Sequence, residues 1–295
     1  MNNFFAGFII TYQRPDVLLE TVSRVFSQTV PPERLWIIDN SEDDRTQIAV
    51  RDSKDPRLEY VRVGYNGGPA LGARMGLELT AKAGYRWIYW GDDNDPPGYQ
   101  DTFEKLVKLG EKRPQCGVLG AVGQYFDRKN GQVRRVPSEV LEQEEYLEVD
   151  FVAGGMSMIV NASMVESGIL PDPGLFFGFE ELDFCIRVKN RGYTVLAHSG
   201  LFLDLRKKYN RIVIEQVSYK KKLNLKREYF SFRNLLYIAD RNRLKRMKIR
   251  LIGKWALKSI YGFKFGVSYG CLNARMILLA FYHYLRGIKG NPVKL

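Results

Sequence analysis

The sequence predicts an α/β fold with a mostly parallel sheet flanked by helices, and two observations support this prediction. Short apolar runs rich in β-branched and aromatic residues alternate with segments of helical periodicity through the first hundred residues. Such alternation is typical of strand–helix–strand units with parallel strands. Polar clusters follow the ends of several runs, which is where parallel sheets bind ligands. At 295 residues, 45% of them hydrophobic, the chain suits one large domain or a domain with an appendage.

The first predicted strand covers residues 4–11 and leads directly into a helix. Pro15 suits the first turn of that helix, because the N–H that proline lacks would have no partner there. Leu18, Val22 and Val25 follow at the i, i+4 and i+7 positions of one helical face. We therefore expect these three side chains to face the sheet.

The next predicted strands cover residues 35–38, 58–63 and 85–90. Before the last of these, a glycine-rich turn opens a helix with Leu71, Met75 and Leu79 on its apolar face. Later in the chain a further helix is expected to end at a glycine, followed by another strand. These elements complete the pattern of a mostly parallel sheet.

Charge divides the chain near residue 205. Residues 1–205 carry 22 Lys+Arg and 30 Asp+Glu, which gives −8, and residues 206–295 carry 23 and 3, which gives +20 and a total of +12. We therefore predict an acidic domain over 1–205 and a basic, helical C-terminal region over 206–295. A uniformly basic nucleic-acid-binding protein fits this distribution poorly, and no nucleic-acid partner is expected.

Several classes of protein are disfavoured by motifs that the sequence lacks. It contains no G-x-G-x-x-G and no G-K-S/T, which counts against dinucleotide dehydrogenases and P-loop enzymes. Two histidines and three scattered cysteines exclude a His-rich zinc site and a disulfide framework, so we expect a reducing compartment. Without a signal peptide or an apolar run of about 20 residues, the expected location is cytoplasmic.

Asp92, Asp93 and Asp95 lie within four residues, directly after a predicted strand. Bunched carboxylates repel one another, so their burial is costly unless a cation compensates. Mg²⁺ and Mn²⁺ take carboxylate oxygens together with substrate phosphates. The cluster therefore predicts a metal–diphosphate site, and the alternative is a solvated acidic turn that caps the next helix.

A second group of acids, Glu180, Glu181 and Asp183, is embedded among bulky apolar residues. Apolar surroundings raise the pKa of a carboxyl group, which is the usual way to prepare a general base. The alternative is an amphipathic helix whose first turn favours acids through the helix dipole. The local residues leave both interpretations open.

Seven short motifs occur in order across roughly residues 3–235. They are Thr11-Tyr12-Gln13-Arg14-Pro15, Ile38-Asp39-Asn40-Ser41, Asn66-Gly67-Gly68-Pro69-Ala70 with Gly72-Ala73-Arg74, Asp92-Asp93-Asn94-Asp95, Gly154-Gly155-Met156, Glu180-Glu181-Leu182-Asp183 with Cys185-Ile186-Arg187, and Tyr229-Phe230-Ser231-Phe232-Arg233-Asn234. Together they resemble the inverting family 2 glycosyltransferases, above all rhamnosyl- and galactofuranosyltransferases. The resemblance implies a nucleotide-diphospho-sugar transferase fold over residues 1–205.

The resemblance also implies how the donor is bound. Thr11, Arg14 and Asp39 would hold the nucleotide of a UDP- or dTDP-linked sugar, with Asp39 at the edge of the base. Gly67 and Arg74 would lie along the nucleotide and its ribose or phosphate. The expected partners are thus a nucleotide-diphosphate sugar and a glycan or lipid-linked acceptor.

The acidic cluster implies a Mn²⁺ or Mg²⁺ ion in the same way. Asp93 or Asp95 would be its main ligand, and Asp92 and Asp93 would lie beside the donor. Many relatives place a metal-binding histidine at the end of the strand after the base helix, and by count Asp204 occupies that place here. His198, six residues earlier, is the alternative ligand or simply a strand residue.

Glu181 matches the position of the catalytic base, and Asp183 is the alternative. Gly154, Gly155 and Met156 would form part of the acceptor wall, unless they are only a glycine bulge within a strand. A carboxylate base and a metal-stabilised leaving group would transfer the sugar by a single displacement that inverts the anomeric centre.

Two rival functions stay open beside sugar transfer to a lipid-linked or cell-surface glycan. One is a catalytically silent glycan-binding or assembly subunit. The other is a sugar nucleotidyltransferase, which normally shows a glycine-rich basic N-terminal loop that Phe5-Ala6-Gly7-Phe8 does not match. The sequence does not decide whether the protein forms a homo-oligomer.

The C-terminal region contains a predicted helix in which Arg250, Lys254 and Lys258 repeat every four residues, with Ile252 and Trp255 on another face. A basic face opposite an aromatic-aliphatic one is typical of a helix in a membrane interface. Each Lys or Arg adds about 1 kcal/mol of attraction to anionic lipid. We therefore expect peripheral binding to the inner face of the cell membrane, the alternative being a helical subdomain whose charges pair with the acidic domain.

Overall fold

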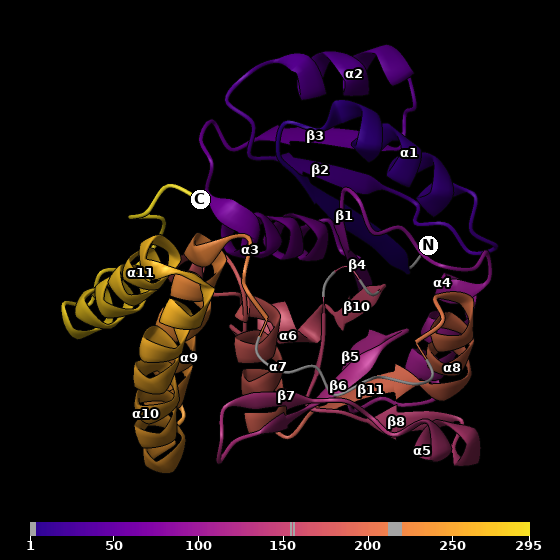
Figure 1. Cartoon of the computed structure of the whole chain (residues 1–295). Helices are drawn as coiled ribbons and strands as arrows, with labels where there is room; N and C mark the ends of the chain where they lie inside the picture. The colour runs from indigo at the N-terminus through magenta and orange to yellow at the C-terminus, as the bar shows by residue number, and fades with distance from the viewer. Residues whose placement is uncertain (1–3, 154, 156, 212–219) are drawn as a thin grey trace.

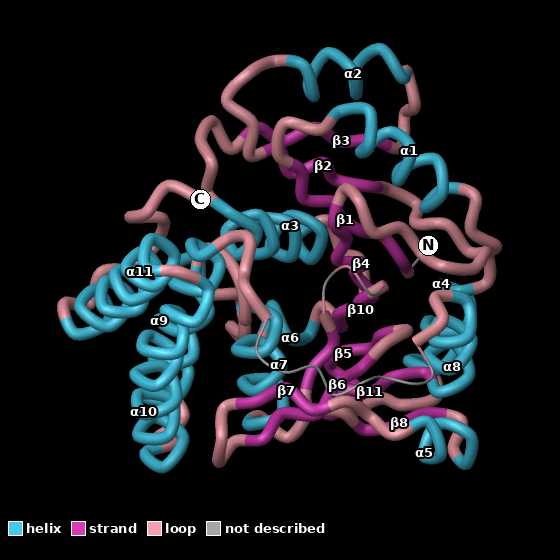
Figure 2. The backbone as a smooth tube through the Cα atoms, viewed as in Figure 1, coloured by secondary structure: helices cyan, strands magenta, loops and turns pink. Residues whose placement is uncertain are grey.

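The computed structural model describes residues 4–153, 155, 157–211 and 220–295. A sheet of eight strands runs through the centre of the molecule, with helices packed around it (Figures 1 and 2). The strands are β1 (Phe5–Thr11), β2 (Leu35–Asp39), β3 (Leu58–Arg62), β4 (Trp87–Asp92), β5 (Cys116–Gly120), β6 (Gly123–Asp127), β7 (Gln132–Arg134), β8 (Tyr146–Glu148), β9 (Phe151–Val152), β10 (Met158–Asn161) and β11 (Thr194–His198).

Eleven α-helices and two short 3₁₀ helices occur in the described part of the chain. They are α1 (Pro15–Phe26), α2 (Arg45–Ser53), α3 (Gly68–Lys82), α4 (Thr102–Glu111), α5 (Ser138–Gln143), α6 (Ser163–Glu166), η1 (Pro173–Leu175), α7 (Glu180–Asn190), α8 (Ser199–Lys208), α9 (Leu225–Arg241), α10 (Lys245–Tyr261), η2 (Gly262–Phe265) and α11 (Val267–Leu285).

The main sheet has the strand order β3-β2-β1-β4-β10-β5-β11-β8. β3, β2, β1 and β4 are parallel neighbours, and β5 and β11 form a second parallel pair. β10 is antiparallel to both β4 and β5, and β8 is antiparallel to β11. The prediction of a mostly parallel α/β sheet is therefore confirmed, with β10 and β8 as its reversed strands.

Each face of the sheet is covered by its own hydrophobic cluster. On one face the predicted α1 residues Leu18, Val22 and Val25 pack with Ile9 and with α4. On the other face lie side chains of α3, α7 and α9. Alternate residues of β1 point into the two clusters, as the two-residue period of a strand requires.

The inner face of α3 differs from the prediction. Leu71, Met75 and Leu79 are only partly buried, while small residues make the closest approach to the sheet. A Cβ atom at Gly76 would lie 2.2 Å from the ring of Phe8, so a larger residue would force α3 away from β1. The packing therefore depends on small residues that a search for large apolar side chains overlooks.

The glycine segment around residue 155 connects two sheets and does not interrupt a single strand. β9 pairs with β6 in a small three-stranded sheet, whereas β10 lies between β4 and β5 in the main sheet. Gly155 lies between these strands. Gly154 and Met156, predicted with it as the acceptor wall, lie outside the described residues.

The C-terminal helices α9, α10 and α11 stand together at one side of the molecule (Figure 1). Large side chains of α9, such as Phe230 and Leu236, belong to the same hydrophobic cluster as residues of the sheet. The boundary predicted at residue 205 falls inside α8. Within the described residues, no helix has both the length and the apolar character needed to span a bilayer.

The predicted separation of basic and aromatic side chains on α10 fails at Lys258, whereas Arg250 and Lys254 are exposed. Trp255 is buried, with its ring stacked 4.8 Å from that of Phe232. Lys258 also faces inward, with its ammonium 4.0 Å from the Trp255 ring centroid and paired with Glu228. Both residues serve packing between helices, because positions three apart share one helical face.

Candidate functional site

Three neighbouring strands end together and bring the polar clusters to one edge of the sheet. Thr11 at the end of β1 is in register with Asp39 at the end of β2. On the other side of β1, Ile10 is in register with Asp92 at the end of β4. The carboxyl ends of parallel strands thus gather the predicted donor-binding and acidic residues, as the sequence indicated.

Asp93 is held from both sides by predicted donor-binding residues. The Thr11 hydroxyl donates to Asp93 Oδ2 over 2.8 Å, and the Arg14 guanidinium lies 2.5 Å from Asp93 Oδ1. Thr21 of α1, which the sequence analysis did not single out, donates to the Asp93 backbone carbonyl over 2.6 Å. Burial raises the pKa of Asp93, and the contacts with Thr11 and Arg14 oppose that rise.

Asp39 is fully buried at the end of β2, and both of its oxygens accept hydrogen bonds. Oδ1 accepts from the Ser41 backbone N–H and Oδ2 from the Tyr60 hydroxyl, each over 2.8 Å. The glycine turn lies next to it, because the Gly67 N–H donates to Asn40 Oδ1 over 3.1 Å. Arg74, in contrast, pairs with Glu78 along α3.

Asp92 lies at the meeting point of the two acidic groups. Burial and the negative charges of Glu181, Asp93 and Asp95 together raise the pKa of Asp92 to about 7. Burial likewise raises the pKa of Asp95, which Arg211 partly offsets. The end of β4 and the beginning of α7 therefore form one negatively charged site, although they are almost ninety residues apart.

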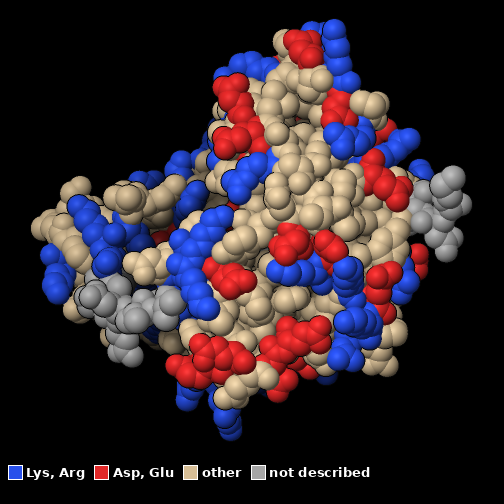
Figure 3. Space-filling view, turned by 90° about the vertical axis from the view of Figure 1, so that its right-hand side faces the viewer, with Lys and Arg blue, Asp and Glu red and all other residues tan. Residues whose placement is uncertain are grey.

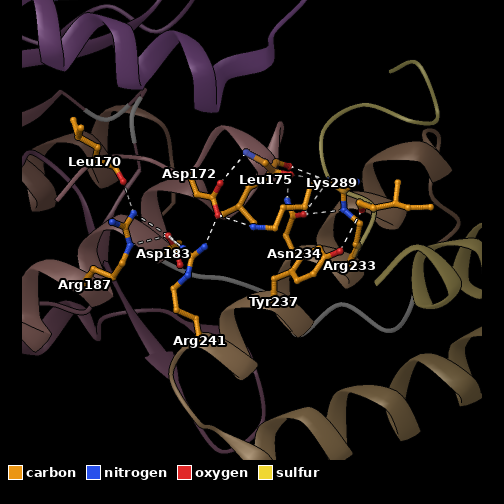
Figure 4. Close-up of polar contacts among 12 residues, drawn as sticks. Leu170, Asp172, Leu175, Asp183, Arg187, Arg233, Asn234, Tyr237, Arg241 and Lys289 are labelled. Atoms are coloured by element: carbon orange, nitrogen blue, oxygen red, sulfur yellow. Dashed lines mark hydrogen bonds and ion pairs between the residues drawn. The ribbon is translucent and has the colours of Figure 1, made fainter. Parts of the chain in front are cut away.

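The three acids of α7 have different surroundings. Glu180 is buried, and burial together with Glu181 and Asp92 raises its pKa. Asp183 is also buried, but it forms ion pairs with Arg187 at 2.9 Å and with Arg241 of α9 at 2.5 Å (Figure 4). Asp183 thus joins α7 to the C-terminal helices, while Glu181 lies on the side of Asp92.

The turn before α7 has a strained backbone. Phe176 has φ 61° and ψ −65°, and the Phe177 N–H donates to the Leu175 carbonyl over 2.8 Å, which defines a three-residue γ-turn of the rare type. Phe179 follows in the left-handed region at φ 67°. Each such residue costs about 1–3 kcal/mol and persists only where surrounding contacts impose it.

A divalent ion fits the carboxylates at the end of β4. Burial raises the pKa of Asp92 and of Asp95, and neighbouring carboxylates add to the rise at Asp92. Asp95 Oδ2 lies against Gly155, where a Cβ would approach to 2.4 Å. Among the described residues no group of three or more His, Cys, Asp and Glu side chains is arranged to hold a metal by itself. The residues therefore suit an ion that also takes ligands from a phosphate.

The placement predicted for Asp204 at the end of a strand is wrong. β11 ends at His198, and α8 begins at Ser199, so Asp204 lies on an exposed turn of that helix. Its backbone carbonyl accepts from the Tyr99 hydroxyl over 3.1 Å. His198 caps α8 by accepting from the Leu201 N–H over 3.3 Å, and burial lowers its pKa.

Comparison with known proteins identifies the family. The model of glycosyl transferase family 2 matches residues 8–165, which is more than half of the 295 residues. The chain belongs to this family. It is a glycosyltransferase, as the seven motifs predicted.

One curated relative of this glycosyltransferase is galactofuranosyltransferase GlfT1 of Mycolicibacterium smegmatis. The two are 23% identical over 254 residues, which cover 81% of this chain and 84% of the relative.

Solved structures confirm the nucleotide-sugar transferase fold. Mannosyltransferase PcManGT of Pyrobaculum calidifontis, in complex with GDP-Man and Mn²⁺, is 13% identical with a TM-score of 0.57, covering 95% of this chain and 86% of that one. S. aureus TarS 1–349 in complex with UDP-GlcNAc is 14% identical with a TM-score of 0.57, covering 97% and 81%.

A cavity of about 480 Å³ opens beside Asp95 in this glycosyltransferase. Gly155 and Ser157 lie on its wall next to the acidic site, and apolar side chains such as Phe202 line another part. Among the described residues, its other charged lining side chains are Arg135, Arg206 and Arg211. The cavity thus has an apolar wall and more positive than negative side chains.

Replacing Asp92 by Asn should stabilise the protein in metal-free buffer. A folded-state pKa near 7, against 3.8 without the fold, means that ionising Asp92 costs stability as pH rises from about 4 to 7. We expect a gain of up to about 4 kcal/mol at pH 8 and a smaller gain at pH 5. Urea denaturation in buffer with EDTA measures the gain in free energy of unfolding at each pH, and Asp52→Asn, at an exposed residue, is the control. Equal gains at the two pH values would contradict the shifted pKa.

Proposed function

We propose that this glycosyltransferase moves a sugar from a nucleotide-diphosphate donor to a glycan or lipid-linked acceptor with inversion of the anomeric centre. The observation that carries the proposal is the convergence of Asp92 and Glu181. It joins the acidic residues after β4 to the carboxylates of α7 at the edge where parallel sheets bind ligands. A silent glycan-binding subunit would have no need for this concentration of buried charge.

The donor nucleotide binds along the ends of β1 and β2 in this proposal. Thr11, Arg14 and Asp39 lie side by side there, and the turn at Gly67 closes one side. UDP and dTDP are the proposed nucleotides. The similarity to a galactofuranosyltransferase makes UDP-galactofuranose the first donor to test.

Asp95 is the proposed main ligand of a Mn²⁺ or Mg²⁺ ion, ahead of Asp93. Asp93 is already engaged by Thr11 and Arg14, whereas the Asp95 carboxylate lies against Gly155 at the cavity. When bound, the ion would offset the charge that develops on the departing diphosphate. The mannosyltransferase in complex with Mn²⁺ gives a divalent ion a precedent on the same fold.

Glu181 is the proposed base, because Asp183 is engaged elsewhere. Two arginines, Arg187 and Arg241, form ion pairs with the buried Asp183 carboxylate. Glu181 would accept the proton of the acceptor hydroxyl as that oxygen attacks the anomeric carbon. With one base and no covalent intermediate, a single displacement gives inversion.

The acceptor enters through the cavity beside Asp95. Gly155 and Ser157 line its wall next to the reacting centre, and the apolar side chains suit the faces of a sugar ring or a lipid-linked group. The three arginines favour an acceptor that carries an acidic group.

A panel of UDP-, dTDP- and GDP-linked sugars, incubated with Mn²⁺ and a synthetic lipid-linked acceptor, tests the proposed function. We expect transfer from one donor, with the product anomer opposite to that of the donor by NMR. Retention of configuration would refute the single displacement. Binding of every donor without transfer or hydrolysis would favour a silent subunit.

We also propose that the C-terminal helices bind the surface of an anionic membrane. Large apolar side chains of α10 are exposed to solvent, with Ile249, Leu257 and Ile260 at 71%, 70% and 70%. An open apolar groove is lined by Phe263 of η2 and by α11 residues such as Leu278 and Tyr282. Residues 206–295 carry a net charge of +20, against −8 for residues 1–205. Another face of the molecule shows acidic and basic side chains interspersed (Figure 3).

Replacing Leu257 and Ile260 by Asp should abolish binding to anionic vesicles without affecting sugar transfer to a soluble acceptor. The expected loss is at least tenfold in vesicle flotation with phosphatidylglycerol, because the change removes apolar contact and adds negative charge. Ile48→Asp, an exposed apolar residue of α2, is the matched control. If the double variant and the control float equally with the wild type, the helices do not form the membrane surface.

A further inference from the structure

Two side chains of the C-terminal region, Arg233 and Asn234 of α9, contact the turn that leads into the proposed catalytic helix. Both are completely buried, and both lie in the last of the seven motifs. Figure 4 shows them pointing toward the segment that contains Leu175. Neither side chain contacts the donor-binding residues described above. We therefore infer their role from the turn that they contact.

Asn234 binds three carbonyl groups of that turn with one amide. Its Nδ2 donates to the carbonyls of Leu175, Phe177 and Gly178 over 2.9, 3.0 and 2.9 Å. These groups surround the γ-turn at Phe176 and end two residues before Glu180. A single side chain thus fixes the direction in which the chain enters α7.

Arg233 fixes the orientation of Asn234 and adds two further contacts. Its Nε and Nη2 both donate to Asn234 Oδ1 over 3.2 Å, which leaves the Asn234 amide nitrogen facing the turn. Nη2 also reaches the carbonyls of Gly174 and Leu175, at 3.4 and 3.2 Å. Nη1 donates to the Gly290 carbonyl over 2.9 Å. The pair therefore ties both α9 and the segment after α11 to the turn.

The charge of Arg233 is not used in an ion pair with any described residue. Its partners are backbone carbonyls, the Tyr229 hydroxyl and the Asn234 amide. Burying a guanidinium against neutral partners, with no carboxylate to pair its charge, is an expensive way to stabilise a core. The cost of burying Arg233 is explained if the turn must be held in one conformation, because Phe176 and Phe179 have unfavourable φ values there.

We propose that Arg233 and Asn234 are positioning residues for the transfer reaction: they hold the strained turn at 174–178 so that Glu181 points at the acceptor hydroxyl. The inference rests on the proposed role of Glu181 as the base. α7 begins immediately after the turn, with the Asp183 N–H donating to the Phe179 carbonyl over 2.9 Å, so a displaced turn displaces the first helical residues. The C-terminal helices thereby contribute to catalysis without contacting substrate.

Asn234→Asp is the sharpest test, because it keeps the shape of the side chain and its contact with Arg233 but removes the amide that donates to three carbonyls. We expect kcat to fall about 100-fold, the loss typical of a misplacement of about 1 Å at a reacting group. The Kd for UDP, measured by calorimetry, should stay within about twofold, since the contacts of Thr11 and Asp39 are unchanged. A change confined to the melting temperature, with kcat per folded molecule unchanged, would overturn the proposal.

Asn273→Asp is the matched control. Asn273 is equally buried, lies in α11, and donates to the Lys258 carbonyl over 3.0 Å, away from α7. This variant should lose thermal stability and keep kcat. Equal losses of kcat in the two variants would assign the effect to general damage and would also overturn the proposal.

Arg233→Lys provides a second variant if Asn234→Asp does not fold. It keeps the charge but cannot bond the two turn carbonyls, Gly290 and Asn234 at once, so we expect a smaller fall in kcat, about tenfold, with the UDP Kd unchanged. An unchanged kcat would contradict the proposal.

The double variant Glu181→Gln/Asn234→Asp separates this inference from the proposed function. If Asn234 acts only through Glu181, the double variant should transfer no more slowly than Glu181→Gln alone. A further 100-fold loss would mean that Asn234 acts on something else. If Glu181→Gln keeps full activity, the proposed base is wrong and this inference fails with it, whereas an inactive Glu181→Gln beside a normal Asn234→Asp rejects only the positioning role.

Discussion

Glu181→Gln should lower the rate of sugar transfer by about 10²- to 10⁴-fold, the range that a general base contributes. Glutamine has nearly the same size but cannot accept the proton of the acceptor hydroxyl. In the proposed site the donor nucleotide would contact residues at the ends of β1 and β2, so its affinity should be unchanged. Initial rates at saturating donor and acceptor, together with calorimetric titration of UDP, measure the two quantities separately.

Asp183→Asn is the control that decides between the two carboxylates left open by the sequence. Removing its charge leaves Arg187 and Arg241 without their buried partner, which costs about 3–5 kcal/mol of stability. We therefore expect a lower melting temperature and, per folded molecule, a nearly normal rate. The opposite result, an active Glu181→Gln and an inactive but stable Asp183→Asn, would move the base to Asp183.

The gathering of Thr11, Asp39 and Asp92 could be predicted from the sequence because it follows from parallel strands. Each residue ends an apolar run, and runs joined by helical segments pair side by side with their carboxyl ends together. Local periodicity and one topological rule were enough to predict that these residues lie at one edge of the sheet. The 82-residue separation between Thr11 and Asp93 was therefore no obstacle to predicting that they belong to one site.

The errors arose where tertiary packing, and not local pattern, decides the outcome. Counting along the chain placed Asp204 at the end of a strand, but β11 stops at His198, whose side chain caps the next helix. On α10, helical periodicity separated Lys258 from Trp255, whereas packing against α9 buries Trp255 and places the Lys258 ammonium over its ring. Neither outcome could be inferred without knowing which surface the neighbouring helix covers.

The contacts of Asn234 are a second feature that could not be predicted from the sequence. The motif around it was recognised, but its partners lie 56 to 59 residues away in an irregular turn. No periodicity connects a helical asparagine to the carbonyls of a γ-turn. A buried asparagine beside a buried arginine indicates a polar network, but only the structure shows that the network ends at the turn before α7.

Asp95→Asn should lower transfer about 10²- to 10³-fold and raise the Mn²⁺ concentration needed for half-maximal activity. The amide keeps a weak oxygen ligand but loses the charge that attracts the ion, and the metal's contribution of several kcal/mol to the transition state corresponds to losses of this size. EDTA should abolish the activity of the wild type, and excess Mn²⁺ should restore it. The measurement is the initial rate across a Mn²⁺ titration.

Asp204→Asn is the matched control for this titration, because it makes the same substitution at an acidic residue on an exposed turn of α8. Its Mn²⁺ dependence should equal that of the wild type. If Asp204→Asn shifted the dependence and Asp95→Asn did not, the ion would have to bind near α8, and the crowding of carboxylates at the end of β4 would need another cause.

Because the pKa values of Asp92 and Asp95 are raised by burial in the same place, a tightly bound ion should also release protons when it binds. Proton release near pH 7 that is lost in Asp95→Asn would thus locate the ion at these carboxylates independently of any rate.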